Sequence, residues 1–223
     1  MLKLDLHIHS EYSEDGTGSV KEIIKSVQRK GLNGLAITDH NTIKGGLSAI
    51  KEAPKDFVVI PGIEISTNDG HVIALNVKED IKRGLSVEET IDLINDKGGI
   101  TIIPHLYRSM SGIKEEKLKN NLSKISAIEV FNSCSVSKTN YKISKLAKKL
   151  KIGGTGGTDS HIPKYCGLAY TTVDTTDKSI DTIISEIQNK KTWGEGENLP
   201  ISYRRNRMTK SIRQFFERGL KRI

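Results

Sequence analysis

The sequence has few cysteines, few aromatic residues and no long apolar segment, and each shortage excludes a class of protein. The 223 residues include two cysteines, Cys134 and Cys166, too few and too far apart for a disulfide framework or a Cys-x-x-Cys site. No apolar run approaches the length of about 20 residues that spans a bilayer. Because the N-terminus enters a strand pattern at once, we expect no signal peptide. We therefore expect a cytoplasmic protein with reduced thiols and no transmembrane segment.

Positive charge is concentrated at the C-terminus. The whole chain carries a net charge of +8, and residues 201–223, with eight Lys or Arg and one acid, account for +7 of it. Apolar residues recur in this segment at helical spacing: Met208, Ile212, Phe215 and Phe216. We expect two parts, a barrel domain over residues 1–199 and a basic helical tail over 200–223. The tail could dock on the barrel, contact nucleic-acid phosphates or lie on a membrane surface.

Short apolar runs typical of buried strands alternate with helical patterns, two of which begin at the capping boxes 19–22 and 86–89. This alternation predicts an α/β protein with a mainly parallel sheet covered by helices. Polar clusters follow about six strands at their C-terminal ends, as in a closed barrel, whereas an open sheet binds ligands at one crevice. We therefore expect a barrel, with these strands: 2–10, 34–38, 57–66, 71–77, 100–103, 127–131, 153–158 and 168–173.

Two histidines share one face of the first expected strand. His7 and His9 are two positions apart, and successive side chains of a strand point to opposite faces. Such a pair either binds a metal ion or consists of two ordinary polar residues on a half-buried strand. The remaining histidines favour the metal site, because each follows or lies within another apolar run: His40, His71, His105 and His161.

Carboxylates accompany these histidines. The candidate metal ligands are His7, His9, Asp15, His40, Glu64, His105, Asp159 and His161, with His71, Glu129 and Asn132 as further candidates. Imidazole and carboxylate ligands without thiolate suit zinc, manganese or iron. So many ligands exceed the need of one ion, which predicts two or three divalent ions that share a bridging carboxylate. Glu64 is the expected bridge, because it is the one acid in an otherwise apolar strand end; alone, it could be a solvated carboxylate. His71 is expected beside the ligands, or as a satisfied strand histidine.

Six segments, in this order, resemble the successive motifs of the PHP (polymerase and histidinol phosphatase) phosphoesterases: residues 5–10 (DLHIHS), 37–41 (ITDHN), 61–64 (PGIE), 104–105 (PH), 129–132 (EVFN) and 157–161 (GTDSH). The resemblance extends from about Leu2 to Val173. It implies a distorted (β/α)7, TIM-like barrel whose metal cluster, usually of three ions, hydrolyses phosphate esters.

The resemblance also implies how the ligands divide among the ions. A first ion would be held by four side chains: His7, His9, Glu64 and Asp159. A second ion would be held by Glu64 and His105. A third would be held by Asp15, His40 and His161.

Two departures from the family pattern bear on the substrate. Asp15 stands where some relatives have His, which is familiar in the branch that acts on nucleotides and short nucleic acids. The strand that carries Asn132 has no histidine, although histidinol phosphatases place a second-ion ligand there. This difference counts against histidinol phosphate as the substrate and leaves water or Asn132 in the shell of the second ion.

Further residues have expected roles in hydrolysis by a metal-activated water. Arg108, three residues past His105, is the candidate phosphate clamp, although it could be a solvated loop arginine. Asp159 or His161 could protonate the leaving alkoxide, although metal ligands are poor acids. Ser10 is expected to hydrogen-bond the site, with an ordinary turn serine as the alternative.

We expect a metal-dependent phosphoesterase that acts on nucleotides, nucleoside bisphosphates or the ends of short oligonucleotides. One alternative is a phosphatase for another small molecule, such as histidinol phosphate or a sugar phosphate. A second alternative is a non-catalytic accessory protein that binds nucleic acid through its basic tail. Because the spacing between Glu64 and Asp159 leaves little room for an inserted domain, we also expect an open pocket.

Overall fold

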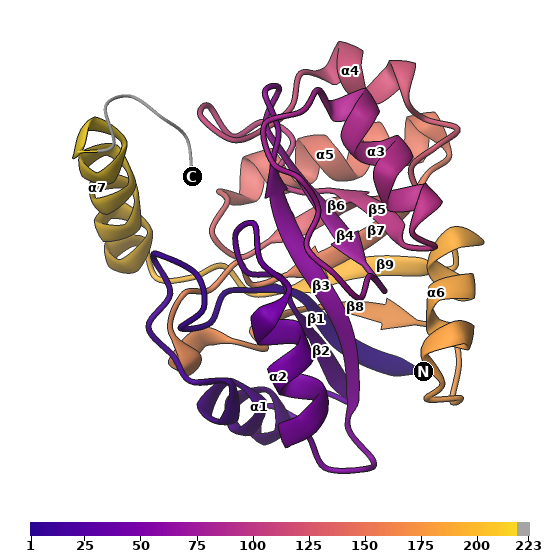
Figure 1. Cartoon of the computed structure of the whole chain (residues 1–223), viewed down its shortest axis with the longest axis vertical. Helices are drawn as coiled ribbons and strands as arrows, with labels where there is room; N and C mark the ends of the chain where they lie inside the picture. The colour runs from indigo at the N-terminus through magenta and orange to yellow at the C-terminus, as the bar shows by residue number, and fades with distance from the viewer. Residues whose placement is uncertain (218–223) are drawn as a thin grey trace.

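One sheet of nine strands organises the part of the chain described by this computed structural model, residues 1–217 (Figure 1). The strands lie in the order β7-β6-β5-β4-β3-β2-β1-β8-β9. Their bounds are β1 Leu2–Ile8, β2 Gly34–Ile37, β3 Val58–Ser66, β4 His71–Leu75, β5 Ile100–Ile103, β6 Ala127–Asn132, β7 Gly153–Gly157, β8 Ala169–Val173 and β9 Thr192–Gly196. Every residue of β2, β3, β4, β5 and β7 is buried, which explains why these segments are nearly continuous apolar or glycine runs.

Seven α-helices accompany this sheet among the described residues, and two of them show how apolar helix faces pack in its core. Their bounds are α1 Val20–Arg29, α2 Lys44–Glu52, α3 Val87–Asp96, α4 Glu115–Asn120, α5 Ser137–Leu150, α6 Ile180–Gln188 and α7 Ile201–Glu217. Both expected capping boxes are present, at Ser19 for α1 and at Ser86 for α3. Val27 of α1 packs in one cluster with Leu35 of β2, and Ile91 of α3 packs in another. These contacts bury the helix faces that the apolar spacing predicts.

The sheet is mainly parallel, as expected, with β4 as the reversed strand among β1 to β7. The reversal follows from the turn at residues 67–70, where Thr67 Oγ1 donates to Gly70 O (2.6 Å) and Gly70 has a φ of +138°. Because β4 runs backwards, its first residue, His71, pairs with Ser66 at the carboxyl end of β3. His71 therefore lies at the rim where the parallel strands end.

The sheet closes into a barrel between β1 and the segment after β7. Asp159 N donates to His7 O (2.7 Å) and His9 N donates to Ser160 O (3.0 Å). The approach is close enough to need glycine, because a Cβ at Gly157 would lie 2.3 Å from His7 Cβ. Beyond this closure, β8 pairs antiparallel with β1 and β9 pairs antiparallel with β8. The expected barrel is confirmed.

Two elements are not predicted by the sequence patterns. Helix α4 has six residues and no side-chain cap at Lys114. Strand β9 contains Gly194 and Gly196 and lacks an apolar alternation. It forms because β8 offers it an unpaired edge, a tertiary context that no local pattern contains.

The C-terminal helix α7 stands at the rim of the barrel, apart from α1 to α6 (Figure 1). The expected tail helix is present, although the side chains of Met208 and Phe215, and residues 218–223 as a whole, lie outside what the structure describes. The division of the chain at residues 199 and 200 into a barrel and a tail stays a prediction. Within residues 1–217, no helix has the length and apolar character needed to cross a membrane.

Asp5 ties the closure together through buried hydrogen bonds. Its Oδ2 accepts hydrogen bonds from Thr158 Oγ1 (2.6 Å) and Gly167 N (2.8 Å), and its Oδ1 accepts one from Thr158 N (3.0 Å). Burial raises the pKa of this carboxyl to about 6, although the hydrogen bonds from Thr158 and Gly167 oppose the shift. One buried side chain thus links β1 to the segments on both sides of the closure.

We expect Asp5→Asn to lower the free energy of unfolding by about 1–3 kcal/mol, because an amide NH2 must then face backbone N–H donors. Chemical denaturation at neutral pH measures the change. The control is Asp174→Asn at an exposed site, where we expect a change within about 0.5 kcal/mol. Equal stability of both variants would contradict the role of Asp5.

Candidate metal centre

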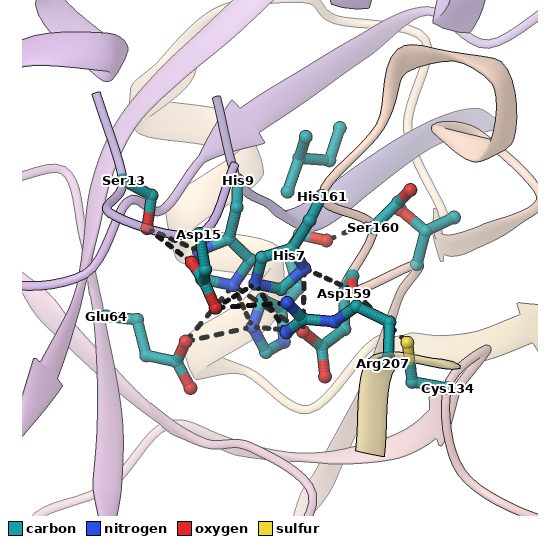
Figure 2. Close-up of polar contacts among 12 residues, drawn as sticks. His7, His9, Ser13, Asp15, Glu64, Cys134, Asp159, Ser160, His161 and Arg207 are labelled. Atoms are coloured by element: carbon teal, nitrogen blue, oxygen red, sulfur yellow. Dashed lines mark hydrogen bonds and ion pairs between the residues drawn. The ribbon is translucent and has the colours of Figure 1, made fainter. Parts of the chain in front are cut away.

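All six histidines of the chain converge at the rim where the barrel closes. Neighbouring imidazole centroids are between 4.0 and 5.7 Å apart along the series His161, His9, His40, His71, His105 and His7. Their side chains are at most 9% exposed. Figure 2 shows three of them pointing toward the carboxylates of the same cluster. The positions of the histidines after successive strands therefore predicted their convergence correctly.

The strands position these residues in a simple way. His7 lies in β1 and His9 directly after it, and their Nε2 atoms are 3.3 Å apart, as expected for one face of a strand. The other residues of the cluster lie in or just after their strands: His40 after β2, Glu64 in β3, His71 in β4, His105 after β5, Glu129 and Asn132 in β6, and Asp159 and His161 after β7.

Glu64 is the carboxylate at the middle of the cluster. Its Oε1 lies 2.9 Å from both His71 Nδ1 and His105 Nε2. Its Oε2 lies 3.2 Å from both His9 Nε2 and His40 Nδ1, and 3.4 Å from His7 Nε2. Burial alone would raise the pKa of this carboxyl, but the surrounding imidazoles, with His71 first, hold it well below its usual range. Glu64 is thus ionised and has both oxygens available to different partners, the arrangement that a bridging ligand needs.

Three ligand atoms have the spacing of one coordination shell: His7 Nε2, His9 Nε2 and Glu64 Oε2, which lie 3.2 to 3.4 Å apart. Asp159 Oδ1 lies 3.7 Å from His7 Nε2 and 3.5 Å from His9 Nε2. A tetrahedron with corners about 2.1 Å from its centre, the usual zinc–ligand distance, has edges of about 3.4 Å. The first three atoms therefore have the spacing of neighbouring ligands on one transition-metal ion, with Asp159 beside them. The family resemblance implies these four residues for the first ion.

A second group of potential ligands lies beside the first: His9, Asp15, His40 and His161. Asp15 Oδ2 is 3.1 Å from His161 Nε2 and 3.9 Å from His40 Nε2. Burial and the neighbouring His9 lower the pKa of His161 to about 4, so its imidazole is neutral at pH 7. Its Nδ1 lies 3.1 Å from the backbone oxygen of Asp159, where it can donate its hydrogen. That tautomer makes Nε2 an acceptor that can bind a cation, and here Arg207 Nη2 lies 2.8 Å from it.

Two buried imidazole nitrogens make no hydrogen bond among the described residues, Nδ1 of His40 and Nδ1 of His105. His40 Nδ1 lies 3.2 Å from Glu64 Oε2 without a hydrogen bond between them. Burial lowers the pKa of both imidazoles, for His105 to about 4, so neither carries an extra proton at pH 7. Unpaired buried nitrogen atoms are costly in a packed protein, and metal ions are a common reason for them.

Glu129 and Asn132 lie behind the ligands. Glu129 Oε1 is 2.9 Å from His7 Nδ1, and its Oε2 accepts hydrogen bonds from His105 N (3.0 Å) and Asn132 Nδ2 (2.8 Å). Asn132 Nδ2 also donates to Asp159 Oδ2 (3.1 Å). A carboxylate on the far nitrogen of a ligating imidazole fixes its orientation and raises its basicity. The structure therefore places these two residues where they can orient ligands.

Two serines hold the loop after β1. Ser10 contacts Asp39 rather than an imidazole, with Oγ donating to Oδ2 (2.7 Å) and N donating to Oδ1 (2.6 Å). Ser13 Oγ donates to Asp15 Oδ1 (3.2 Å) and accepts from His40 N (3.2 Å). Sequence reasoning missed Ser13, and only its distance of two residues from Asp15 could have indicated it.

Two arginines flank the cluster. Arg108 forms an ion pair with Asp159 and donates to Asn132 Oδ1 (3.3 Å), while its side chain stays 32% exposed. Burial would lower the pKa of this guanidinium, but the charge of Asp159 raises it above its usual range. The second is Arg207 of α7, which reaches Asp15 Oδ2 (3.1 Å) and His161 Nε2 (2.8 Å) (Figure 2). Sequence reasoning counted Arg207 only as part of the basic tail.

The geometry agrees with a comparison to known families. The sequence model of the PHP domain matches residues 5–192. The chain belongs to the PHP domain family. The expected resemblance is thus confirmed, and the protein is a metal-dependent hydrolase of the PHP type. The identity and number of its ions, and the roles of individual residues, stay predictions.

Two curated proteins are similar to this PHP protein over part of its chain. A protein of Methanocaldococcus jannaschii named only as uncharacterised is 38% identical over 144 residues, which cover 59% of this chain and 82% of the relative. A 5'-3' exoribonuclease of Haemophilus influenzae is 33% identical over 106 residues, which cover 45% of this chain and 38% of the relative.

Solved structures share the PHP fold. A two-domain protein of Bacteroides vulgatus, which contains a predicted PHP-like metal-dependent phosphoesterase, superimposes with a TM-score of 0.74 at 18% identity. The match covers 88% of this chain and 65% of that one. Endonuclease Q in complex with a 27-mer duplex carrying an abasic lesion superimposes with a TM-score of 0.66 at 17% identity, over 88% of this chain and 60% of the other.

We expect Glu64→Gln to reduce affinity for Mn²⁺ and Zn²⁺ by at least about 100-fold, because a neutral amide cannot bridge cations between five imidazoles. Titration calorimetry and metal analysis after dialysis measure the loss. Glu195→Gln, at an exposed glutamate of β9, is the matched control and should bind metal as the unmodified protein does. Full metal content in Glu64→Gln would exclude a bridging role.

Metal binding should tighten as the pH rises toward 9. Burial would lower the pKa of His9, but Asp159 and Glu64 raise it to about 9, and His7 is raised likewise by Glu129, Asp159 and Glu64. Both imidazoles therefore hold a proton at pH 7 that an ion must displace, so affinity should rise by up to about 10-fold per pH unit for each proton released.

Calorimetry of Mn²⁺ binding between about pH 6.5 and 8.5, in buffers with different ionisation enthalpies, counts the released protons. His105 and His161, with pKa values lowered to about 4, should release none in this range. Constant affinity without proton release would show that His7 and His9 are neutral before the ion binds.

Proposed function

We propose that this PHP protein hydrolyses phosphate esters of nucleotides, nucleoside bisphosphates or the ends of short oligonucleotides. The observation that carries the proposal is the buried cluster of six imidazoles with Asp15, Glu64 and Asp159, flanked by Arg108 and Arg207. Cations held by such a cluster, next to guanidinium groups, match a phosphate ester in charge and geometry. Two free cysteines suit action in the cytoplasm.

We assign the metal ligands as the resemblance implies. His7, His9, Glu64 and Asp159 would hold one ion, and Asp15, His40 and His161 another. Glu64 and His105 would hold a further ion, with His71 close enough to Glu64 to compete for the same oxygen. When bound, two or three zinc, manganese or iron ions would neutralise phosphate oxygens and lower the pKa of an attacking water.

The protein residues then position the substrate. Arg108 is the phosphate clamp, because its guanidinium is partly exposed and its partner Asp159 belongs to the ligand set. Asn132 holds both Arg108 and Asp159, which fixes the distance between the clamp and the metal site. His161 is neutral with its Nδ1 hydrogen directed at a backbone oxygen, so it suits ligation better than donation of a proton to the leaving group. Although burial would raise the pKa of Asp159, Arg108 and His7 hold it well below its usual range, so Asp159 is ionised and that proton comes from solvent.

Three features support a nucleotide-type substrate. Asp15 occupies the position that the resemblance associates with the branch acting on nucleotides and short nucleic acids, and it lies against His161. The exoribonuclease of Haemophilus influenzae and endonuclease Q, the latter bound to DNA, are nucleic-acid enzymes that share this domain or its fold. The basic helix α7 adds a surface that attracts nucleic-acid phosphates.

The alternatives have weaker support. A histidinol phosphatase would need a histidine where β6 carries Asn132. A non-catalytic accessory protein would have no use for the buried cluster, whose charges are costly to keep folded without ions.

A phosphoester panel in added Mn²⁺ or Zn²⁺ tests the proposal. We expect kcat/KM for nucleoside phosphates, bisphosphates or 5'-phosphorylated oligonucleotides to exceed that for histidinol phosphate and sugar phosphates by at least about 10-fold. Chelation should abolish turnover, and His9→Ala should lower kcat by at least about 10³-fold. A preference for a non-nucleotide ester, or turnover that survives His9→Ala, would overturn the assignment.

A further inference from the structure

Helix α7 is anchored to the rim of the barrel through its first turns and the residues before them. Leu199 N donates to Ser133 O (2.9 Å), and Asn198 Nδ2 donates to Ser135 O (2.7 Å). Arg204 Nη1 donates to the same Ser135 oxygen (3.0 Å). These contacts attach the start of the helix to the loop between β6 and α5, beside the metal centre.

A second set of contacts attaches α7 to the loop after β7. The Tyr203 hydroxyl accepts a hydrogen bond from His161 N (3.4 Å), and its ring packs edge-on against Tyr165 at 4.8 Å between centroids. Residues 203, 204 and 207 are one, three and four positions apart, so they share one face of the helix. The anchored face is therefore the face that carries Arg207 into the site.

Arg207 contacts the same atoms that would hold the third ion. Its Nη1 lies 3.1 Å from Asp15 Oδ2, and its Nη2 lies 2.8 Å from His161 Nε2. The side chain is 19% exposed, so the guanidinium lies in the site rather than in solvent. A divalent ion on Asp15 and His161 would take those two acceptors away from Arg207 and repel its charge.

The displaced guanidinium would remain at the mouth of the site with unpaired donors. The partner it then needs is an anion with several oxygens, and the phosphoryl group that the ions bind is such a partner. Arg108 already lies on the side of Asp159, whereas Arg207 lies on the side of Asp15. Together the two arginines can contact different oxygens of one phosphate from opposite sides of the ligand cluster.

We propose that α7 forms a wall of the active site and that Arg207, which pairs with Asp15 and His161 here, binds a non-bridging oxygen of the phosphate ester once divalent ions occupy the centre. The inference rests on the proposed function. In this proposal α7 supplies one wall of the pocket, because the short segment between Glu64 and Asp159 leaves little room for an inserted domain to do so.

The test uses the full-length chain loaded with Mn²⁺ and inorganic phosphate as the probe. Arg207→Ala should weaken phosphate binding in calorimetry by about 10- to 100-fold, and raise KM for a nucleoside monophosphate similarly, because a charge-assisted hydrogen bond is lost. Manganese stoichiometry should be unchanged and manganese affinity equal or higher. Arg207→Lys should recover part of the phosphate affinity, since it retains the charge but not the planar fork.

Arg205→Ala is the matched control, because Arg205 is exposed on the same helix and makes no contact with the site among the described residues. It should leave phosphate binding and KM within about two-fold of the unmodified protein. Thermal unfolding of each variant checks that a change in phosphate binding or KM does not result from unfolding of the protein.

Three results would overturn the proposal. Unchanged phosphate affinity in Arg207→Ala, with tighter manganese binding and faster turnover, would make Arg207 an inhibitory plug of the third metal site. Equal loss of phosphate affinity in Arg207→Ala and Arg205→Ala would indicate a general effect of charge. Loss of bound manganese in Arg207→Ala would indicate a structural role.

The phosphate titration also separates this inference from the proposed function. If nucleotides are not hydrolysed but Arg207→Ala still weakens binding of inorganic phosphate, the substrate assignment fails and the role of Arg207 stands.

Discussion

The burial of Glu64 among imidazoles is the constraint on which the rim of this barrel depends. A carboxylate that is 1% exposed must be compensated, and five histidine side chains lie within 3.4 Å of its oxygens. The compensation is uneven, because the pKa values of His7 and His9 are raised whereas those of His40, His105 and His161 are lowered. His7 and His9 hold protons where cations would bind, so the charge balance and the metal affinity depend on the same side chains.

Barrel closure brings this cluster together. The parallel strands all end at one rim, the reversed strand β4 adds its first residue there, and the close approach at Gly157 lets β7 meet β1. Asp5 joins the segments on both sides of that closure. The metal centre therefore lies where the barrel closes, next to backbone that these hydrogen bonds hold in place.

Helix α7 brings a segment from the far end of the chain to the metal centre. It lies at the rim of the barrel and is attached there by Tyr203 and Arg204. One of the basic residues of this segment, Arg207, thus lies at the site.

The sequence by itself determined the barrel, the rim and nearly all residues that converge there, because strand periodicity and strand ends are local properties that read directly from the chain. His7 and His9 share a face for that reason, and His40, Glu64, His105 and Asp159 each mark the end of a strand. Only the tertiary structure decided that β9 adds to the edge of β8, that Ser13 holds Asp15, and that Arg207 enters the site. These depend on contacts between segments as far apart as Asp15 and Arg207, 192 positions along the chain, which no local pattern encodes.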